Sequence, residues 1–183
     1  MLLSLTLLTL STVLSCENDG HWPQFRGPFA SGLADGAKTV AEFDLATKKN
    51  VLWSVETPGF ALSSPIVWGE RIYLTTAVRK AGAAELRVGL YGDIEPVADE
   101  GAHLFQVLAY DRKDGKLLWS QTVFDGEPKF PRHPKGSFAA STPATDGKHV
   151  VSFFGTEGLY VHDTEGKLVW KKDLGELDAG FYL

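Results

Sequence analysis

The chain alternates between short apolar runs and acidic turns, and one such unit occurs twice. Residues 104–119 read L-F-Q-V-L-A-Y-D-R-K-D-G-K-L-L-W, and residues 158–170 read G-L-Y-V-H-D-T-E-G-K-L-V-W. In each copy an apolar run leads through an acidic turn with Gly-Lys into a second apolar run that ends in Trp. Two apolar runs joined by a short turn that contains Gly predict a β-hairpin.

The two turns share a chemistry that suits a tight reversal of the chain. Gly accepts a positive φ at no steric cost, and an Asp side chain accepts hydrogen bonds from turn amides. We therefore expect both hairpins to close in the same way, with Trp119 and Trp170 ending equivalent strands. The turn residues are Asp111, Asp114 and Gly115 in the first copy, and Asp163, Glu165 and Gly166 in the second.

The repeat extends upstream of each hairpin. Residues 63–76 and 140–155 both carry a Ser/Thr-Pro pair followed by a short apolar strand, a Gly turn and a second strand. Each complete unit then has four antiparallel strands, which is the composition of a β-propeller blade. The sequence predicts an all-β propeller with about two blades in this chain. A strand near Val51–Val55, around Trp53, resembles the last strand of a blade and is expected to close the ring.

These repeats resemble the quinoprotein-like, or PQQ-like, β-propeller repeat family. The resemblance is carried by residues 109–119, which have an Asp-x-x-x-Gly-x-x-x-Trp core, and by residues 161–170, which have the same core with one residue fewer between Asp and Gly. The segment W-P-Q-F-R-G-P at 22–28 is similar to the opening motif of a secreted, BamB-like branch of that family. The family's propellers have more blades than two, so we expect this chain to be the N-terminal part of a larger propeller, or several copies to form a ring.

The first fifteen residues form an uncharged apolar run that is too short to span a bilayer and is typical of a secretory signal. The single cysteine, Cys16, follows V-L-S and resembles the lipidated cysteine of a bacterial lipobox. The alternative is a signal peptidase site with an incidental Cys.

We expect residues 1–16 to be a signal and lipobox, 17–50 a tether with the N-terminal motif, and 51–183 a partial propeller. The protein is then exported to the periplasm or the outer membrane, or is extracellular. In the tether we expect the aromatic rings of Trp22 and Phe25 to dock on the propeller and Arg26 to form an ion pair. The alternative is that these three residues form a binding feature.

Composition narrows the range of partners. The chain of 183 residues is 44% hydrophobic and 22% charged, as ordinary globular domains are, and its net charge is −5. This charge argues against nucleic-acid binding and against a polybasic membrane surface. A single cysteine also excludes an intrachain disulfide.

Two long connections are candidates for function. The loop at 124–138 is basic, and Arg132, His133 and Lys135 form a candidate site for an anion or a partner, with a plain surface loop as the alternative. The insertion between Val78 and Ala102 is acidic, but its spacing does not fit a calcium-binding EF-hand loop, so a solvated loop is expected.

No catalytic or metal site is predicted. The histidines lack metal-ligand spacing, and no phosphate-binding loop or nucleophile elbow occurs. The resemblance therefore implies a non-enzymatic scaffold that binds protein partners, like the lipoproteins of outer-membrane protein assembly, with no cofactor. The alternative is a fragment of a PQQ-dependent dehydrogenase, whose quinone site would lie in blades outside this chain; a carbohydrate-binding propeller is a third class.

Overall fold

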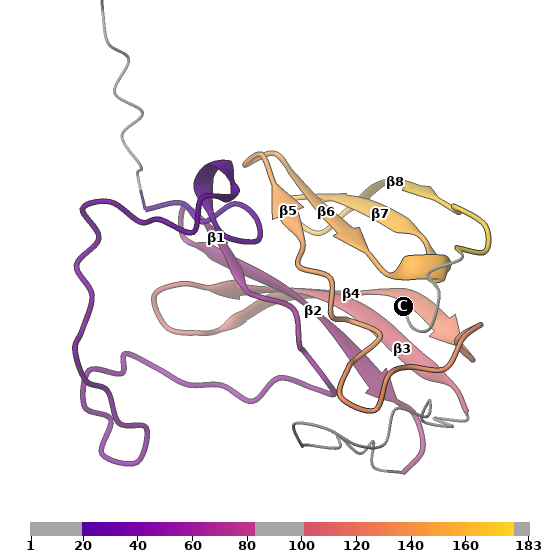
Figure 1. Ribbon diagram of the computed structural model, residues 1–183, viewed down its shortest axis with the longest axis horizontal. Helices are drawn as coiled ribbons and strands as arrows, with labels where there is room; N and C mark the ends of the chain where they lie inside the picture. Colours follow the sequence, from indigo (N-terminus) through magenta and orange to yellow (C-terminus); the bar gives the residue numbers. More distant parts are fainter. Residues whose placement is uncertain (1–19, 83–100, 178–183) are drawn as a thin grey trace, which may run out of the picture.

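The computed structural model describes residues 20–82 and 101–177, and these residues form two four-stranded antiparallel sheets (Figure 1). The first sheet has the order β1 (Ile66–Trp68), β2 (Arg71–Arg79), β3 (His103–Asp111) and β4 (Leu117–Gly126). The second has the order β5 (Ala144–Thr145), β6 (His149–Phe153), β7 (Leu159–Asp163) and β8 (Leu168–Lys172). Two single-turn 3₁₀ helices, η1 (Pro28–Ala30) and η2 (Gly155–Glu157), accompany them. The all-β prediction and the two four-stranded blades are confirmed.

The two sheets pack face to face over one hydrophobic core. Phe105 lies at its centre, with its ring 4.8 Å from that of Phe124 and 5.4 Å from those of Phe138 and Phe154. Ring separations of this size are those of favourable aromatic pairs. Phe105 comes from β3, while Phe138 and Phe154 follow β4 and β6, so the core joins the two repeats.

The innermost strands, β1 and β5, are linked through the small polar residues that precede them. The Ser64 amide donates to Thr142 Oγ1 at 3.1 Å, and Thr75 Oγ1 donates to the carbonyl of Ser141 at 3.2 Å. Ser64 and Thr142 are the equivalent Ser/Thr-Pro positions of the two repeats. Short hydroxyl side chains at these positions let adjacent blades approach closely while their backbone groups stay hydrogen-bonded.

The strands are joined by short turns at one end of the sheets and by long connections at the other end. The turns β1–β2, β3–β4, β5–β6 and β7–β8 are short, and the first two lie side by side because the Arg112 amide donates to the Glu70 carbonyl at 2.8 Å. The long connections, between β2 and β3 and between β4 and β5, leave from the opposite ends of the strands. We call these ends the turn face and the loop face.

Two details of the strand prediction need correction. Trp119 and Trp170 are the third residues of β4 and β8 rather than their last, because each strand continues outward past the indole. Residues 51–55 pair with no strand in the described part of the chain, although a strand was predicted there. A ring-closing role for this segment stays a prediction.

The N-terminal motif packs on the first sheet, but less completely than expected. Trp22 forms an antiparallel bridge with Val67 in β1, whereas Phe25 is 60% exposed. Arg26 donates to the carbonyl of Ser31 at 3.4 Å and forms no ion pair with the residues that the structure describes, although an ion pair was predicted. The tether therefore contacts the propeller through residues 21–23, and all residues from 31 to 50 are exposed.

Candidate functional site

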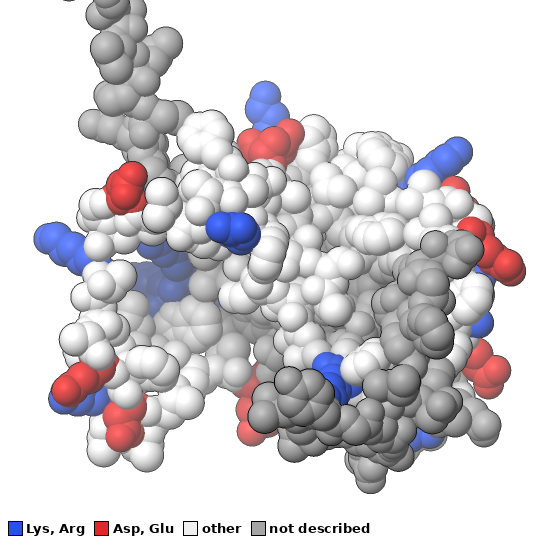
Figure 2. Space-filling model, viewed as in Figure 1, with Lys and Arg blue, Asp and Glu red and all other residues white. Residues whose placement is uncertain are grey.

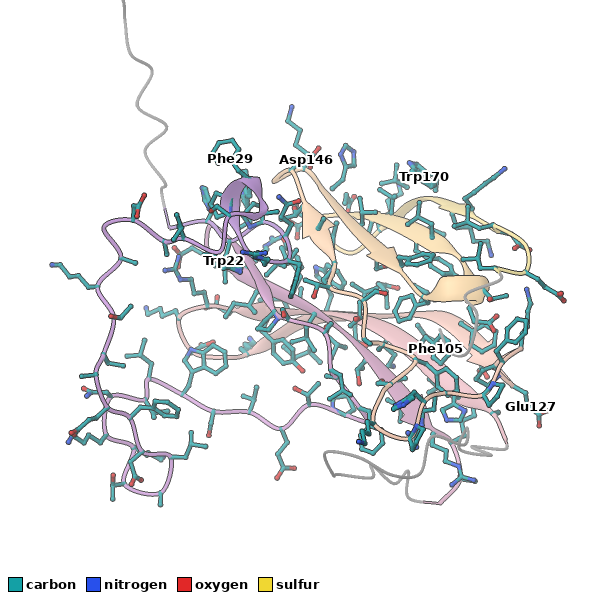
Figure 3. The ribbon with its side chains drawn as sticks, viewed as in Figure 1. Trp22, Phe29, Phe105, Glu127, Asp146 and Trp170 are labelled. Atoms are coloured by element: carbon teal, nitrogen blue, oxygen red, sulfur yellow. The ribbon has the colours of Figure 1, made fainter. Side chains whose placement is uncertain are left out.

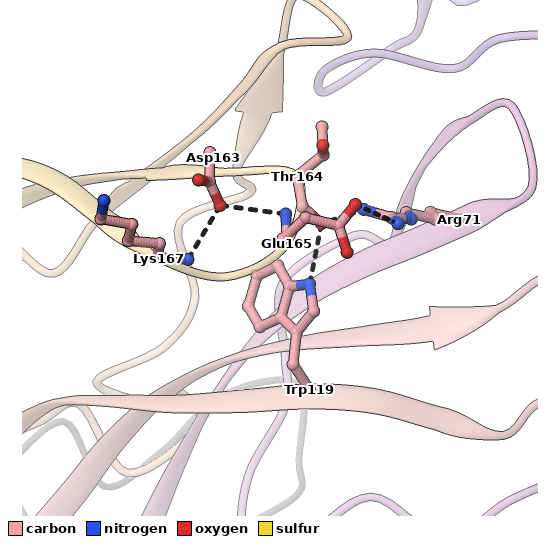
Figure 4. A network of polar contacts seen from close by, with 6 residues as sticks. All are labelled: Arg71, Trp119, Asp163, Thr164, Glu165 and Lys167. Carbon is pink, nitrogen blue, oxygen red and sulfur yellow. Dashed lines mark hydrogen bonds and ion pairs between the residues drawn. The ribbon is translucent and has the colours of Figure 1, made fainter.

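The best-defined site among the described residues is the junction between the outer strand of the first sheet and the last turn of the second (Figure 4). The indole of Trp119 in β4 lies against Gly166, where an added Cβ would come within 2.7 Å of the ring. Its Nε1–H donates to the carbonyl of Thr164 at 2.9 Å. Only glycine leaves room for an indole at this distance, so this turn and the outer strand of the first sheet meet through one Trp and one Gly.

The turn that receives Trp119 is shaped by its own side chains, as the sequence predicted. Asp163 Oδ1 accepts hydrogen bonds from the amides of Glu165 at 3.0 Å and Lys167 at 2.8 Å, and Gly166 has a φ of 86°. The hairpin of the first repeat closes in the same way, with Asp111 and Asp114 accepting turn amides and Gly115 at a φ of 75°. Both hairpin predictions are confirmed.

An ion pair braces the same junction. Arg71, at the start of β2, lies 2.5 Å from the carboxylate of Glu165 and also donates to the carbonyl of Thr164. The side chain of Glu165 is 74% exposed, so solvent screens this pair and it adds little stability. Its main effect is positional, because it holds the turn over Trp119.

The same arrangement recurs before the first sheet. Trp53 Nε1–H donates to the carbonyl of Arg112 at 2.9 Å, and an added Cβ at Gly115 would lie 2.5 Å from the Trp53 ring. Arg112 and Thr164 both follow the first Asp of their turns. Trp53 thus occupies, against the first sheet, the place that Trp119 occupies against the second.

The third Trp of the series has no such turn against it in the described residues. Trp170 in β8 is 47% exposed and borders an open hollow of about 360 Å³ on the free face of the second sheet. Val151 and Val161 form its apolar floor, and Asp146 and His149 stand at its margin. The outer face of the second sheet therefore presents the indole of a junction, but no glycine turn among the described residues receives it.

Trp68 makes a further contact that sequence reasoning missed. Its indole lies against Gly147 in the β5–β6 turn, where an added Cβ would come within 2.4 Å, and the ring of His21 stacks on it with centroids 4.2 Å apart. His21 Nδ1 also accepts a hydrogen bond from the Gly69 amide. The sequence shows that Gly69 and Gly147 occupy the equivalent turns of the two repeats. It does not show that an indole lies against Gly147 and that none lies against Gly69.

Asp146 organises this turn through its carboxylate. Hydrogen bonds from the backbone amides of His149 and Lys148, joined by the imidazole of His149, lower the pKa of Asp146 far below its ordinary value. The carboxylate thus stays ionised at any physiological pH and contributes to turn geometry rather than to proton transfer.

The basic loop predicted at 124–138 begins within β4, which continues to Gly126, and the rest of it folds inward. Its three candidate residues occupy different environments. Arg132 is 1% exposed, with its guanidinium donating to the carbonyls of His133 and Gly136 and lying 5.4 Å from the ring of Phe60. His133 is partly buried, and its Nδ1 accepts the Lys135 amide. Carbonyl and ring contacts of a buried guanidinium are those of a loop anchor. Anion or partner binding by Arg132, His133 and Lys135 stays a prediction.

The outer edges of the two sheets differ in charge and length. β4 spans ten residues, with Asp125 as its single charged side chain, whereas β8 spans five and ends in Lys171 and Lys172. The outer edge of β4 pairs with no strand in the described part of the chain. Lysines on an edge strand oppose pairing with another chain, and a long edge with few charges permits it.

Charge does not gather into a large patch on the face seen in Figure 2. The part of that face that is not grey is mostly white, and blue and red side chains stand singly or in small groups across it. Within residues 20–82 and 101–177, no three His, Cys, Asp or Glu side chains gather to hold a metal ion. The same ranges contain no helix with the length and hydrophobicity of a membrane span. Cys16 and the carboxylates of the acidic insertion, from Glu85 to Glu100, lie outside the described residues.

Comparison with protein families agrees with this geometry. The two four-stranded sheets and their indole-to-glycine junctions are consistent with blades of a β-propeller. Residues 103–179, from the first residue of β3 to beyond β8, match the family model described as outer membrane protein assembly factor BamB. The resemblance to the PQQ-like repeat family is thereby confirmed for this segment. A search of curated proteins found no match.

Proposed function

We propose that this chain is a non-enzymatic β-propeller scaffold that binds extended segments of partner proteins along the outer edge of β4. The observation that carries the proposal is that edge: ten residues long, nearly uncharged and unpaired in the described part of the chain. A partner strand that adds to such an edge gains backbone hydrogen bonds without needing a deep pocket. The matched family's description as an outer membrane protein assembly factor supports partners that are themselves β-strands.

The experiment uses fluorescence anisotropy with a labelled ten-residue peptide that has the alternating apolar pattern of a transmembrane β-strand. We expect saturable binding to the wild-type chain, and roughly tenfold weaker binding to a Ser120→Lys/Thr122→Lys variant, because two lysines on the edge oppose strand addition. Leu168→Lys in β8 is the matched control and should bind as the wild type does. Equal affinity of all three proteins, each with an unchanged circular dichroism spectrum, would overturn the proposal.

We further propose that Cys16 is lipidated, which would tether the propeller to the outer membrane on its periplasmic side. The V-L-S-C sequence after an apolar run supports this proposal. Mass spectrometry of the N-terminal peptide from membrane fractions should show a diacylglycerol-modified Cys16, and Cys16→Ser should abolish the modification. An unmodified peptide that begins elsewhere would favour an incidental cysteine after a signal peptidase site.

The proposed scaffold needs no cofactor, nucleic acid or metal. We expect pyrroloquinoline quinone with Ca²⁺ neither to bind the chain nor to support dye reduction. Saturable quinone binding by this chain would instead favour the dehydrogenase alternative.

A further inference from the structure

A tight turn in the N-terminal motif displays two large aromatic side chains to solvent. This segment, residues 25–29, is called the aromatic turn below. Phe25 is 60% exposed and Phe29 is 84% exposed. Figure 3 shows Phe29 projecting away from both sheets. Rings this exposed add almost nothing to the hydrophobic core, so folding does not explain them.

The aromatic turn is held firmly on the propeller. Trp22 exchanges two backbone hydrogen bonds with Val67, at 2.7 and 2.9 Å, and the carbonyl of Pro23 accepts the Thr145 amide at 2.8 Å. An added Cβ at Gly27 would lie 2.5 Å from the Trp22 ring, so the turn folds back directly onto the docked indole. The exposed rings are therefore presented by a fixed support that joins both sheets.

The backbone of the turn is strained in a way that its residue types do not favour. Arg26, Phe29 and Ala30 have φ values of 61°, 55° and 53°, in the left-handed region that glycine adopts most easily. A bulky residue in this region is a genuine outlier whose backbone is strained. Phe29 is thus both strained and exposed, a combination that points to a binding role.

The turn lies close in sequence to Cys16, the candidate site of lipidation. The described structure begins at Gly20, four residues after Cys16, and four residues span at most about 14 Å. A lipid on Cys16 would hold Gly20 within that distance of the bilayer surface, and Trp22, against which the turn folds, follows two residues later. From Gly20 to Ala34 the single charged side chain is that of Arg26, so little opposes entry of the turn into lipid.

We propose that the aromatic turn inserts Phe25 and Phe29 into the interfacial layer of the bilayer that holds the Cys16 lipid. The occupant of this surface is a phospholipid membrane, and the inference rests on the proposed lipidation of Cys16. Apolar side chains next to a lipid anchor add a second, short-range attachment at the level of the headgroups. The lipid alone is a flexible tether, whereas the lipid and the aromatic turn together fix how the propeller faces the membrane.

The test measures the depth of a spin label in the mature lipidated protein, reconstituted in phosphatidylethanolamine–phosphatidylglycerol vesicles. Lipidation uses the thiol of Cys16, so Phe29→Cys supplies a single labelling site. Leu52→Cys, at a residue that is 92% exposed in the same N-terminal part, is the matched control. We expect the label at position 29 to be at least threefold more accessible to oxygen, relative to a water-soluble nickel complex, than the label at position 52.

Two results would overturn the inference. Equal, water-like accessibility at both positions, with a lipid on Cys16 established by mass, would refute membrane insertion while leaving lipidation intact. A label at position 29 that is equally shielded without vesicles would show that protein, rather than lipid, covers the turn. If mass spectrometry finds no lipid on Cys16, the lipidation proposal fails first and this inference fails with it.

Discussion

Trp119 and Trp170 occupy the same position in the outer strands of the two sheets, yet their surroundings differ. Trp119 lies on Gly166, donates to the carbonyl of Thr164, and has its ring 5.9 Å from that of Tyr73 and 6.2 Å from that of His162. Trp170 is 47% exposed beside an open hollow. Each repeat thus supplies one indole and one glycine turn, and the indole acquires its partner from the repeat that follows. A repeat of this kind is stable through its neighbours rather than by itself.

The largest effect should come from removing the docked indole. Trp119→Ala deletes a large ring at the junction and is expected to lower the free energy of unfolding by about 3 kcal/mol or more. Trp170→Ala removes an exposed ring and should change it by less than about 1 kcal/mol. Urea denaturation of both variants measures the difference, and similar losses would contradict the comparison.

The acceptor half of the junction gives the second prediction. Gly166→Ala forces a Cβ to 2.7 Å from the Trp119 ring at a φ of 86°, so clash and backbone strain add. We expect a loss of about 2–4 kcal/mol. Gly69→Ala is the control, because Gly69 has a φ of 57° but no atom within 4 Å of an added Cβ, which leaves strain alone. Its loss should be about 1–2 kcal/mol. Equal thermal shifts of the two variants would show that the indole contact is unimportant.

The smallest effect should appear as a dependence on pH. Burial lowers the pKa of His162, which packs beside Trp119 and has an Nδ1 that hydrogen-bonds to no described residue. In the unfolded chain a histidine titrates near about 6.5. Below that value the unfolded chain therefore binds more protons than the folded one, and stability falls as the pH decreases.

Unfolding free energies measured between pH 5 and pH 8 test whether stability falls as the pH decreases. They should be highest above about pH 6.5 and should decline below it. His162→Phe removes the titrating group and should flatten the decline. The depressed pKa of Asp146 acts well below this range and does not interfere. An unchanged slope in the variant would assign the pH dependence to other groups.

Local signals in the sequence predicted the blades well. The Asp and Gly residues of both hairpin turns lie within a few residues of each other, so the turn conformation could be predicted from the sequence alone. The equivalence of Trp119 and Trp170 was also visible, because it follows from spacing. Their exact place within the strand was not, since the turn residues mark where a strand begins but nothing in the sequence marks where its outer edge ends.

Contacts between distant segments were the part that the sequence did not reveal. The sequence marked Arg132, His133 and Lys135 as a candidate anion or partner site, with a plain surface loop as the alternative. It did not reveal that the guanidinium of Arg132 is buried against carbonyls and Phe60, more than 70 residues away. Likewise, residues 51–55 have the pattern of a strand, yet strand formation requires a neighbouring strand that the described residues do not supply. Trp53 nevertheless docks, because its acceptor turn at Gly115 is present.

The separation of the turn face from the loop face has a consequence for how such a chain evolves. An insertion in a β3–β4 or β7–β8 turn would displace a glycine from beneath an indole and loosen two repeats at once. An insertion between β2 and β3, or between β4 and β5, leaves those junctions untouched. The loop face can therefore accept inserted sequence while the indole-to-glycine junctions of the turn face keep their geometry.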